Sequence, residues 1–152
     1  MAKTVGYMVT WTTYGTWLQG DERGYVKDSK ILPASSALAV ANKLALTKKP
    51  VRLSFDQRRI IEETVRQKAV RFGQRIYAMA VCTNHVHLVA ENIPRPIGVI
   101  VQRYKSYSVR AIRKTGIDGR VWTNGFDKRY CFDRHSLQQK IDYVNSHFRK
   151  HK

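Results

Sequence analysis

Four short segments rich in apolar and β-forming residues, at 5–12, 74–82, 85–91 and 128–132, predict β-strands. In the third of them polar and apolar residues alternate from His85 to Leu88, as expected of a strand whose successive side chains point to opposite faces. Thr83-Asn84 separates the second segment from the third. These two strands are therefore expected to form a hairpin.

A period of 3.6 residues marks a helix between the first two strands. Ser54 and Gln57 have the spacing of a capping box, which predicts a helix from Ser54 to about Arg71. Its apolar face is expected to contain Ile60, Ile61, Val65 and Ala69. An Ala-rich and Leu-rich stretch at residues 36–47 predicts a further short helix.

Two more helices are expected in the second half of the chain. Pro96 excludes an earlier start for the first of them, which is predicted from Ile97 to about Lys114 with a stop at Gly116. The last helix is expected to begin near Ser136, with Gln139 as its capping-box partner.

The predicted order is strand, helix, strand, strand, helix, strand and a final helix. With right-handed crossovers, this order favours an α+β fold with a ferredoxin-like antiparallel sheet and an added C-terminal helix. Residues 1–152 are interpreted as one domain. Residues 13–35, which are rich in glycine and charge, read as a loop-rich insertion, and a loop of this length is usually functional.

The composition indicates a polyanionic partner. The formal charge is +17, from 28 Lys and Arg against 11 Asp and Glu. Such a surplus repels itself in a compact state, which favours a nucleic-acid partner over an anionic membrane or a merely basic protein. No apolar run approaches the ~20 residues that span a bilayer, and no signal peptide is recognisable. We therefore expect a cytoplasmic protein without membrane contact, in which Cys82 and Cys131 are reduced and buried.

His85 and His87 are the first candidates for chemistry. Residues i and i+2 of a strand share a face, so the two imidazoles would project together while Val86 and Leu88 face the core. Paired imidazoles of this kind can hold a metal ion. The same alternation is also typical of a half-buried strand with two polar residues on its wet face.

The final helix supplies a second pair. Its buried stripe is predicted to contain Leu137, Ile141, Val144 and Phe148. Tyr143 and His147 lie on a flank of this stripe and face together, as i and i+4 residues do. Alternatively, Tyr143 is an amphipathic boundary residue and His147 belongs to a solvated basic end.

Other residues are candidates for nucleic-acid contacts. Tyr104 lies within the apolar stripe of its helix and is expected in the core, and Tyr107 at the edge of that stripe is a weaker candidate for a functional tyrosine than Tyr143. The opposite, basic face carries Arg103, Arg110, Arg113 and Lys114. The aromatic residues that could stack on unpaired bases, or pack in the core instead, are Trp11, Tyr14 and Trp17.

Three ordered motifs carry a family resemblance: Asn-His-Val-His-Leu-Val at 84–89, Val-Trp-Thr-Asn-Gly-Phe at 121–126 and Ile-Asp-Tyr-Val at 141–144. Together they resemble the single-tyrosine HUH transposases, over nearly the whole chain. The segments 11–18 and 20–24 look especially like the group associated with repetitive extragenic palindromes. The resemblance implies a ferredoxin-like catalytic domain that acts on single-stranded or hairpin DNA at the nucleoid, as a monomer or a homodimer.

By this resemblance, Tyr143 is the nucleophile of a DNA strand transferase that works through a 5′-phosphotyrosine. It also implies a divalent ion, Mn²⁺ or Mg²⁺, on His85, His87 and His147. His147 departs from the family pattern, which typically has Gln or Asn as the third ligand. Imidazole suits Mn²⁺ better than Mg²⁺, so stronger activity with Mn²⁺ is expected.

Three alternatives remain at this level. A non-catalytic DNA-binding protein with the same fold would keep the basic helix without cleavage. Cys82 could join His85 and His87 in a zinc site, although a turn separates it from them. A histidine-triad hydrolase would require a further alternating histidine, which is absent after Val89.

Overall fold

The computed structural model describes residues 3–16 and 50–150, with side chains to His147. The helix expected at residues 36–47, most of the loop-rich insertion, Trp17 and the side chain of Phe148 lie outside this description.

Four antiparallel strands form one sheet in the order β2-β3-β1-β4. The strands are β1 (Gly6–Thr12), β2 (Ile76–Val81), β3 (His85–Glu91) and β4 (Asp127–Cys131). The predicted ferredoxin-like order is therefore confirmed, and β3 has the predicted bounds. β3 and β1 are the central strands, so residues on them are surrounded by structure on both sides.

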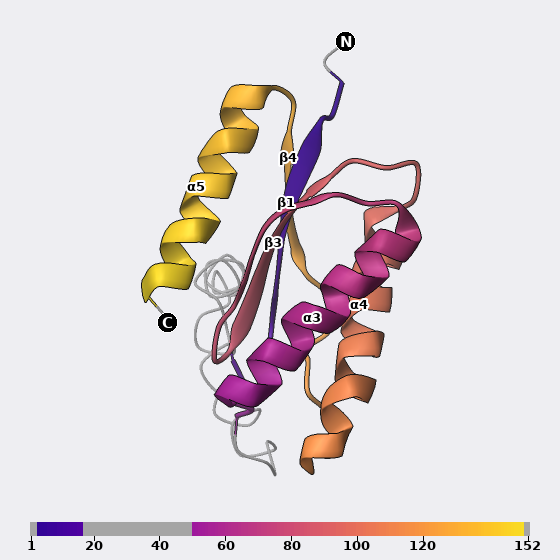
Figure 1. Ribbon diagram of the computed structural model, residues 1–152, viewed down its shortest axis with the longest axis vertical. Coiled ribbons are helices and arrows are strands. Elements are labelled where there is room, and N and C mark those ends of the chain that lie inside the picture. The colour runs from indigo at the N-terminus through magenta and orange to yellow at the C-terminus, as the bar shows by residue number, and fades with distance from the viewer. Residues whose placement is uncertain (1–2, 17–49, 151–152) are drawn as a thin grey trace, which may run out of the picture.

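Helices cover both faces of the sheet. α3 (Phe55–Phe72) and α4 (Ile97–Ile112) pack on one face, and in the described part of the chain α5 (Arg134–Lys150) covers the other (Figure 1). A short 3₁₀ helix, η2 (Arg113–Thr115), extends α4 to Gly116, whose φ of 94° allows the left-handed turn. Val86 and Leu88 face the α3/α4 core, whereas Val89 faces the core under α5.

The capping box of α3 is present as predicted. The Ser54 hydroxyl accepts a hydrogen bond from the Gln57 N–H, and the Gln57 side chain accepts one from the Ser54 N–H. α5 begins at Arg134, two positions before the predicted vicinity of Ser136, and the predicted capping role of Ser136 is wrong. Asp133 Oδ1 accepts the Ser136 N–H at 2.7 Å, so the carboxylate caps the helix in place of the serine hydroxyl. This hydrogen bond lowers the pKa of Asp133 below its usual value.

Tyr104 belongs to the core, as predicted. It is fully buried, and its O–H donates to Gln74 Oε1 at 2.6 Å. Gln74 in turn donates to the Tyr7 hydroxyl and to the Glu91 carbonyl. Burial raises the pKa of Tyr104 far above its usual value, so the residue stays a neutral phenol that ties α4 to the sheet.

The segment at 121–126 is held by α4 and by the end of β1. The Lys105 ammonium on α4 donates to the carbonyls of Thr123 and Gly125 at 2.8 and 2.9 Å. Trp122 Nε1 donates back to the Lys105 carbonyl at 3.1 Å. On the other side, the Thr123 N–H donates to the Thr12 carbonyl at 3.0 Å. Burial lowers the pKa of Lys105, and the nearby Arg120 charge lowers it further.

Lys105→Met is expected to lower the melting temperature by roughly 5 °C. The two carbonyl groups would lose their donor, which costs about 1–3 kcal/mol and is partly offset by removal of a buried charge. In a protein of this size, 1 kcal/mol corresponds to about 2–4 °C. Differential scanning fluorimetry measures the change, with Lys114→Met at an exposed position as control. An unchanged melting temperature for Lys105→Met would contradict a net stabilising role of these two hydrogen bonds.

Within residues 3–16 and 50–150, no helix has both the length and the apolar character needed to cross a bilayer.

Candidate active site

His85 and His87 lie on the face of β3 that α5 covers. The two residues are only 8% and 6% exposed, and their ring centroids are 4.7 Å apart. The shared face was predicted correctly, and the alternative of two polar residues on a wet face is wrong. α5 packs across β2 and β3 and removes these imidazoles from bulk water. Burial of polar rings requires polar partners, and the structure supplies them.

Both rings are oriented through Nδ1. His85 Nδ1 is 2.7 Å from Asn84 Oδ1, and His87 Nδ1 is 2.8 Å from Thr10 Oγ1. The amide oxygen of Asn84 can only accept, so His85 carries its proton on Nδ1. The ring proton fixes the tautomer in which Nε2 has the lone pair. Hydrogen bonds of this kind typically orient metal-binding histidines.

α5 brings Tyr143 and His147 to the two strand histidines. The Tyr143 ring centroid lies 5.5 Å from that of His87 and 5.0 Å from that of His147. The His147 ring lies 4.5 Å from His87 and 5.3 Å from His85. Tyr143 is 46% exposed, so its phenol borders both the histidine cluster and solvent. The flank of α5 that carries Tyr143 and His147 therefore faces the sheet, beside the buried stripe that contains Leu137 and Val144.

The three histidines form a cluster that could hold a metal ion. One ring nitrogen of each residue lies within 4.8 Å of the others. In a metal complex with bonds of about 2.0–2.1 Å, the two nitrogens of any pair would be at most about 4 Å apart. The donor set is all nitrogen, which suits Mn²⁺, Co²⁺ or Zn²⁺ better than Mg²⁺.

Thr10 is a site residue that the sequence interpretation missed. It pairs with His87 across β1 and β3, and with Asp127 across β1 and β4. Antiparallel partners share a face, so a row from His87 through Thr10 to Asp127 leads to the edge of the sheet. Asp127 is exposed there and lies 3.5 Å from Arg129. The only signal in the sequence was the alternation of the first strand, because register is set by tertiary pairing.

Cys82 does not join the histidine cluster. Among the described residues, the grouping of metal-binding side chains contains only the three histidines. Cys82 is buried in the core beneath α5, and burial raises the pKa of its thiol from 9.0 to about 11. The zinc-site alternative therefore has no geometric support. Both cysteines are free thiols and buried, as expected.

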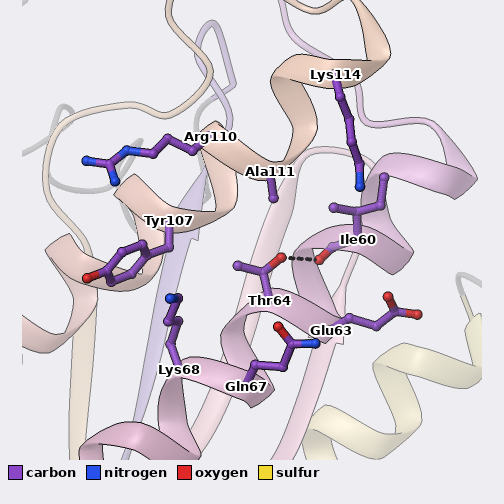
Figure 2. A pocket seen from close by; sticks show the side chains of 9 residues that line it. All are labelled: Ile60, Glu63, Thr64, Gln67, Lys68, Tyr107, Arg110, Ala111 and Lys114. Atoms are coloured by element: carbon purple, nitrogen blue, oxygen red, sulfur yellow. Dashed lines mark hydrogen bonds between the residues drawn. The ribbon is translucent and has the colours of Figure 1, made fainter.

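Tyr107 lies on the opposite side of the molecule from the histidines. It is on α4 and lines a pocket between α3 and α4, which also contains Lys68, Arg110 and Lys114 (Figure 2). The Lys68 ammonium is 4.2 Å from the centre of the Tyr107 ring. The four residues that were predicted to form a basic helical face are all exposed. They are Arg103, Arg110, Arg113 and Lys114.

The aromatic candidates near the first strand have different environments. Trp11 is 1% exposed and packs edge-on against Trp122 at 6.1 Å, so the core-packing alternative is the correct one. Its Nε1 has no hydrogen-bond partner within the described part of the chain. Tyr14 is half-buried, with the Arg120 guanidinium 5.1 Å from its ring centre.

The fold is that of a tyrosine transposase. A solved REP-associated tyrosine transposase bound to a REP hairpin has a TM-score of 0.59 and 12% identity, covering 98% of this chain and 69% of that chain. The chain belongs to the family of IS200-like transposases, because the sequence model of this family matches residues 45–147. A candidate transposase from Deinococcus radiodurans R1 has 15% identity and a TM-score of 0.48, covering 96% of this chain and 92% of that chain. No curated protein matches the chain.

Proposed function

We propose that this transposase cleaves and rejoins single-stranded DNA at or near hairpins, with Tyr143 as the nucleophile and a divalent metal ion as cofactor. The observation that carries this proposal is the meeting of Tyr143 with three histidines from two separate elements. The charge of +17 suits a nucleic-acid substrate. The REP hairpin bound by the structural relative supports hairpin DNA as the substrate class.

His85, His87 and His147 would hold the metal ion. The hydrogen bonds of Asn84 and Thr10 keep two of the rings in place, so their Nε2 atoms would be the ligands. When bound, a divalent ion would act as a Lewis acid on the scissile phosphate. Because the strand histidines are buried, the site excludes much of the water that would weaken electrostatic interactions.

Tyr143 would attack the phosphorus with its phenolic oxygen. The bond from phosphorus to the 3′-oxygen breaks, the phenol loses its proton and the leaving 3′-oxygen gains one. The products are a 5′-phosphotyrosine and a free 3′-hydroxyl. Because the phosphotyrosine bond conserves the energy of the broken phosphodiester bond, a second 3′-hydroxyl can attack the phosphotyrosine and release Tyr143. The partial exposure of Tyr143 leaves room for a DNA strand at its ring.

Four exposed basic residues of α4 and η2 would contact DNA phosphates. These residues are Arg103, Arg110, Arg113 and Lys114. Tyr14 is half-buried and would stack on an unpaired base.

Labelled single-stranded hairpin oligonucleotides test the proposed activity. The protein is incubated with them and Mn²⁺, and the products are separated under denaturing conditions. A protein–DNA band that resists denaturant is expected. If the protein binds these oligonucleotides but forms no such band on any palindromic substrate, it is a non-catalytic DNA-binding protein.

His147→Gln is expected to change the metal preference. The wild-type protein should cleave faster with Mn²⁺ than with Mg²⁺, because its ligands are all imidazoles. An amide oxygen at this position should lower the ratio of Mn²⁺ to Mg²⁺ rates by roughly tenfold. Cleavage rates at matched metal concentrations measure the ratio. Equal rates with both ions in the wild type would argue against His147 as a ligand.

A further inference from the structure

A basic groove runs beside α4 on the side of the 121–126 segment. It has a volume of about 460 Å³ and lies between α4 with its extension η2 on one wall and residues 120–125 on the other. The proposed function expects Arg110 and Arg113 to contact DNA phosphates, but it assigns no role to residues 120–125, which form the second wall.

The groove is strongly positive. Arg110 and Arg113 line one wall and Arg120 lines the other, and no carboxylate occurs among the described residues that line it. In the described part of the chain, none of the three arginines forms an ion pair with Asp or Glu. Clustered positive charges repel one another, so a bound polyanion would stabilise this arrangement.

The wall opposite α4 is pre-organised. Lys105 is 7% exposed, and its ammonium holds the backbone carbonyls of Thr123 and Gly125 by hydrogen bonds. Trp122 in turn donates a hydrogen bond from its indole to the Lys105 carbonyl on α4. The Lys105 ammonium is held by two neutral carbonyls, so its positive charge adds to that of the arginines. A preformed wall reduces the entropy lost when a ligand binds.

The same wall leads to the histidine cluster. Thr123 and Thr12 share a hydrogen bond of 2.6 Å between their hydroxyls. Thr12 in turn pairs with His85 across β1 and β3. Two steps of about 5 Å between neighbouring backbones therefore separate the groove wall from the metal-binding cluster.

We propose that this groove binds the phosphates of the single-stranded DNA next to the hairpin and guides that strand to Tyr143. The inference rests on the proposed function and adds the surface that binds the single-stranded DNA. Arginine is suited to phosphate because its planar guanidinium can donate two parallel hydrogen bonds. Asn124, which is exposed at the groove, would add polar contacts to the bases or sugars.

The pocket between α3 and α4 is less suited to this role. It contains the Glu63 carboxylate, and the Lys68 ammonium already lies against the Tyr107 ring (Figure 2).

DNA binding without cleavage tests the proposal. All variants are made in the Tyr143→Phe background, so that the DNA is bound but not cleaved. One substrate is a fluorescent hairpin with a single-stranded flank of about eight to ten thymidines, which is the length of one small binding site. The other substrate is the same hairpin without a flank. Dissociation constants are measured by fluorescence anisotropy at several salt concentrations. Arg113→Gln and Arg120→Gln are compared with Arg71→Gln, an equal change of charge at an exposed position of α3 outside the groove.

Each groove variant is expected to bind the flanked hairpin roughly fivefold more weakly. The slope of log affinity against log salt should fall by about 0.7 for each arginine removed. The hairpin without a flank and the Arg71→Gln variant should change less than about twofold. Arg113→Lys and Arg120→Lys keep the charge and should restore the salt slope, which a merely structural role would not predict.

An equal loss of affinity for both hairpins, or an equal loss in Arg71→Gln, would overturn the groove assignment. This outcome is distinct from failure of the cleavage proposal. If wild-type protein forms no covalent adduct but the groove variants lose affinity selectively, the groove stands and cleavage fails. If adducts form while the groove variants bind the flanked hairpin normally, cleavage stands and the groove assignment is wrong.

Discussion

Tyr143→Phe is expected to abolish the covalent adduct with hairpin DNA, with a fall in cleavage rate of at least about 10⁴-fold. Phenylalanine keeps the ring that packs beside His87 and His147 but removes the oxygen that would attack phosphorus. Because Tyr143 is 46% exposed, the fold and DNA affinity should be nearly unchanged. Denaturing gels with labelled oligonucleotides and Mn²⁺ measure the adduct.

Tyr107→Phe is the matched control. Tyr107 is a partly buried tyrosine on α4 and lies in the pocket against α3, on the face of the sheet opposite α5 (Figure 2). This variant should form the adduct at the wild-type rate. If Tyr143→Phe still forms the adduct and Tyr107→Phe does not, the nucleophile has been assigned to the wrong helix.

His87→Ala is expected to weaken Mn²⁺ binding by at least about 100-fold and to stop cleavage. His87 lies closest to the other rings of the cluster, with centroids 4.7 Å from His85 and 4.5 Å from His147. Isothermal titration calorimetry measures the affinity. The melting temperature without metal shows separately whether loss of this buried ring damages the fold.

Two further variants define the metal site more closely. His135→Ala removes an exposed histidine from the first turn of α5 and should leave Mn²⁺ affinity unchanged. Thr10→Val removes the hydrogen-bond partner of His87 Nδ1 and should weaken binding by about 10-fold to 100-fold. Tight Mn²⁺ binding by His87→Ala would contradict the proposed ligand set.

The sequence predicted the parts of the structure that depend on local pattern. The alternation in His85–Glu91 predicted β3 to the residue, and Ser54 with Gln57 predicted the cap of α3. Helical spacing also brought Tyr143 and His147 together on one flank of α5. These features follow from strand and helix periods, which a single sequence displays directly.

The features that the sequence did not predict depend on how distant elements pack. The histidines are buried because α5 covers their face, and Thr10 reaches His87 because of the register between β1 and β3. Trp11 lies in the core because Trp122 packs on it. Tertiary arrangements of this kind leave no periodic signal in either segment alone.

The central claim is that Tyr143 becomes covalently attached to DNA. The most direct measurement digests the protein–DNA adduct with protease and nuclease and locates the modified residue by tandem mass spectrometry. The expected result is a nucleotide 5′-phosphate on the Tyr143 side chain in the peptide from α5. A nucleotide on Tyr107, Tyr130 or any other residue, with Tyr143 unmodified, would contradict the proposed mechanism.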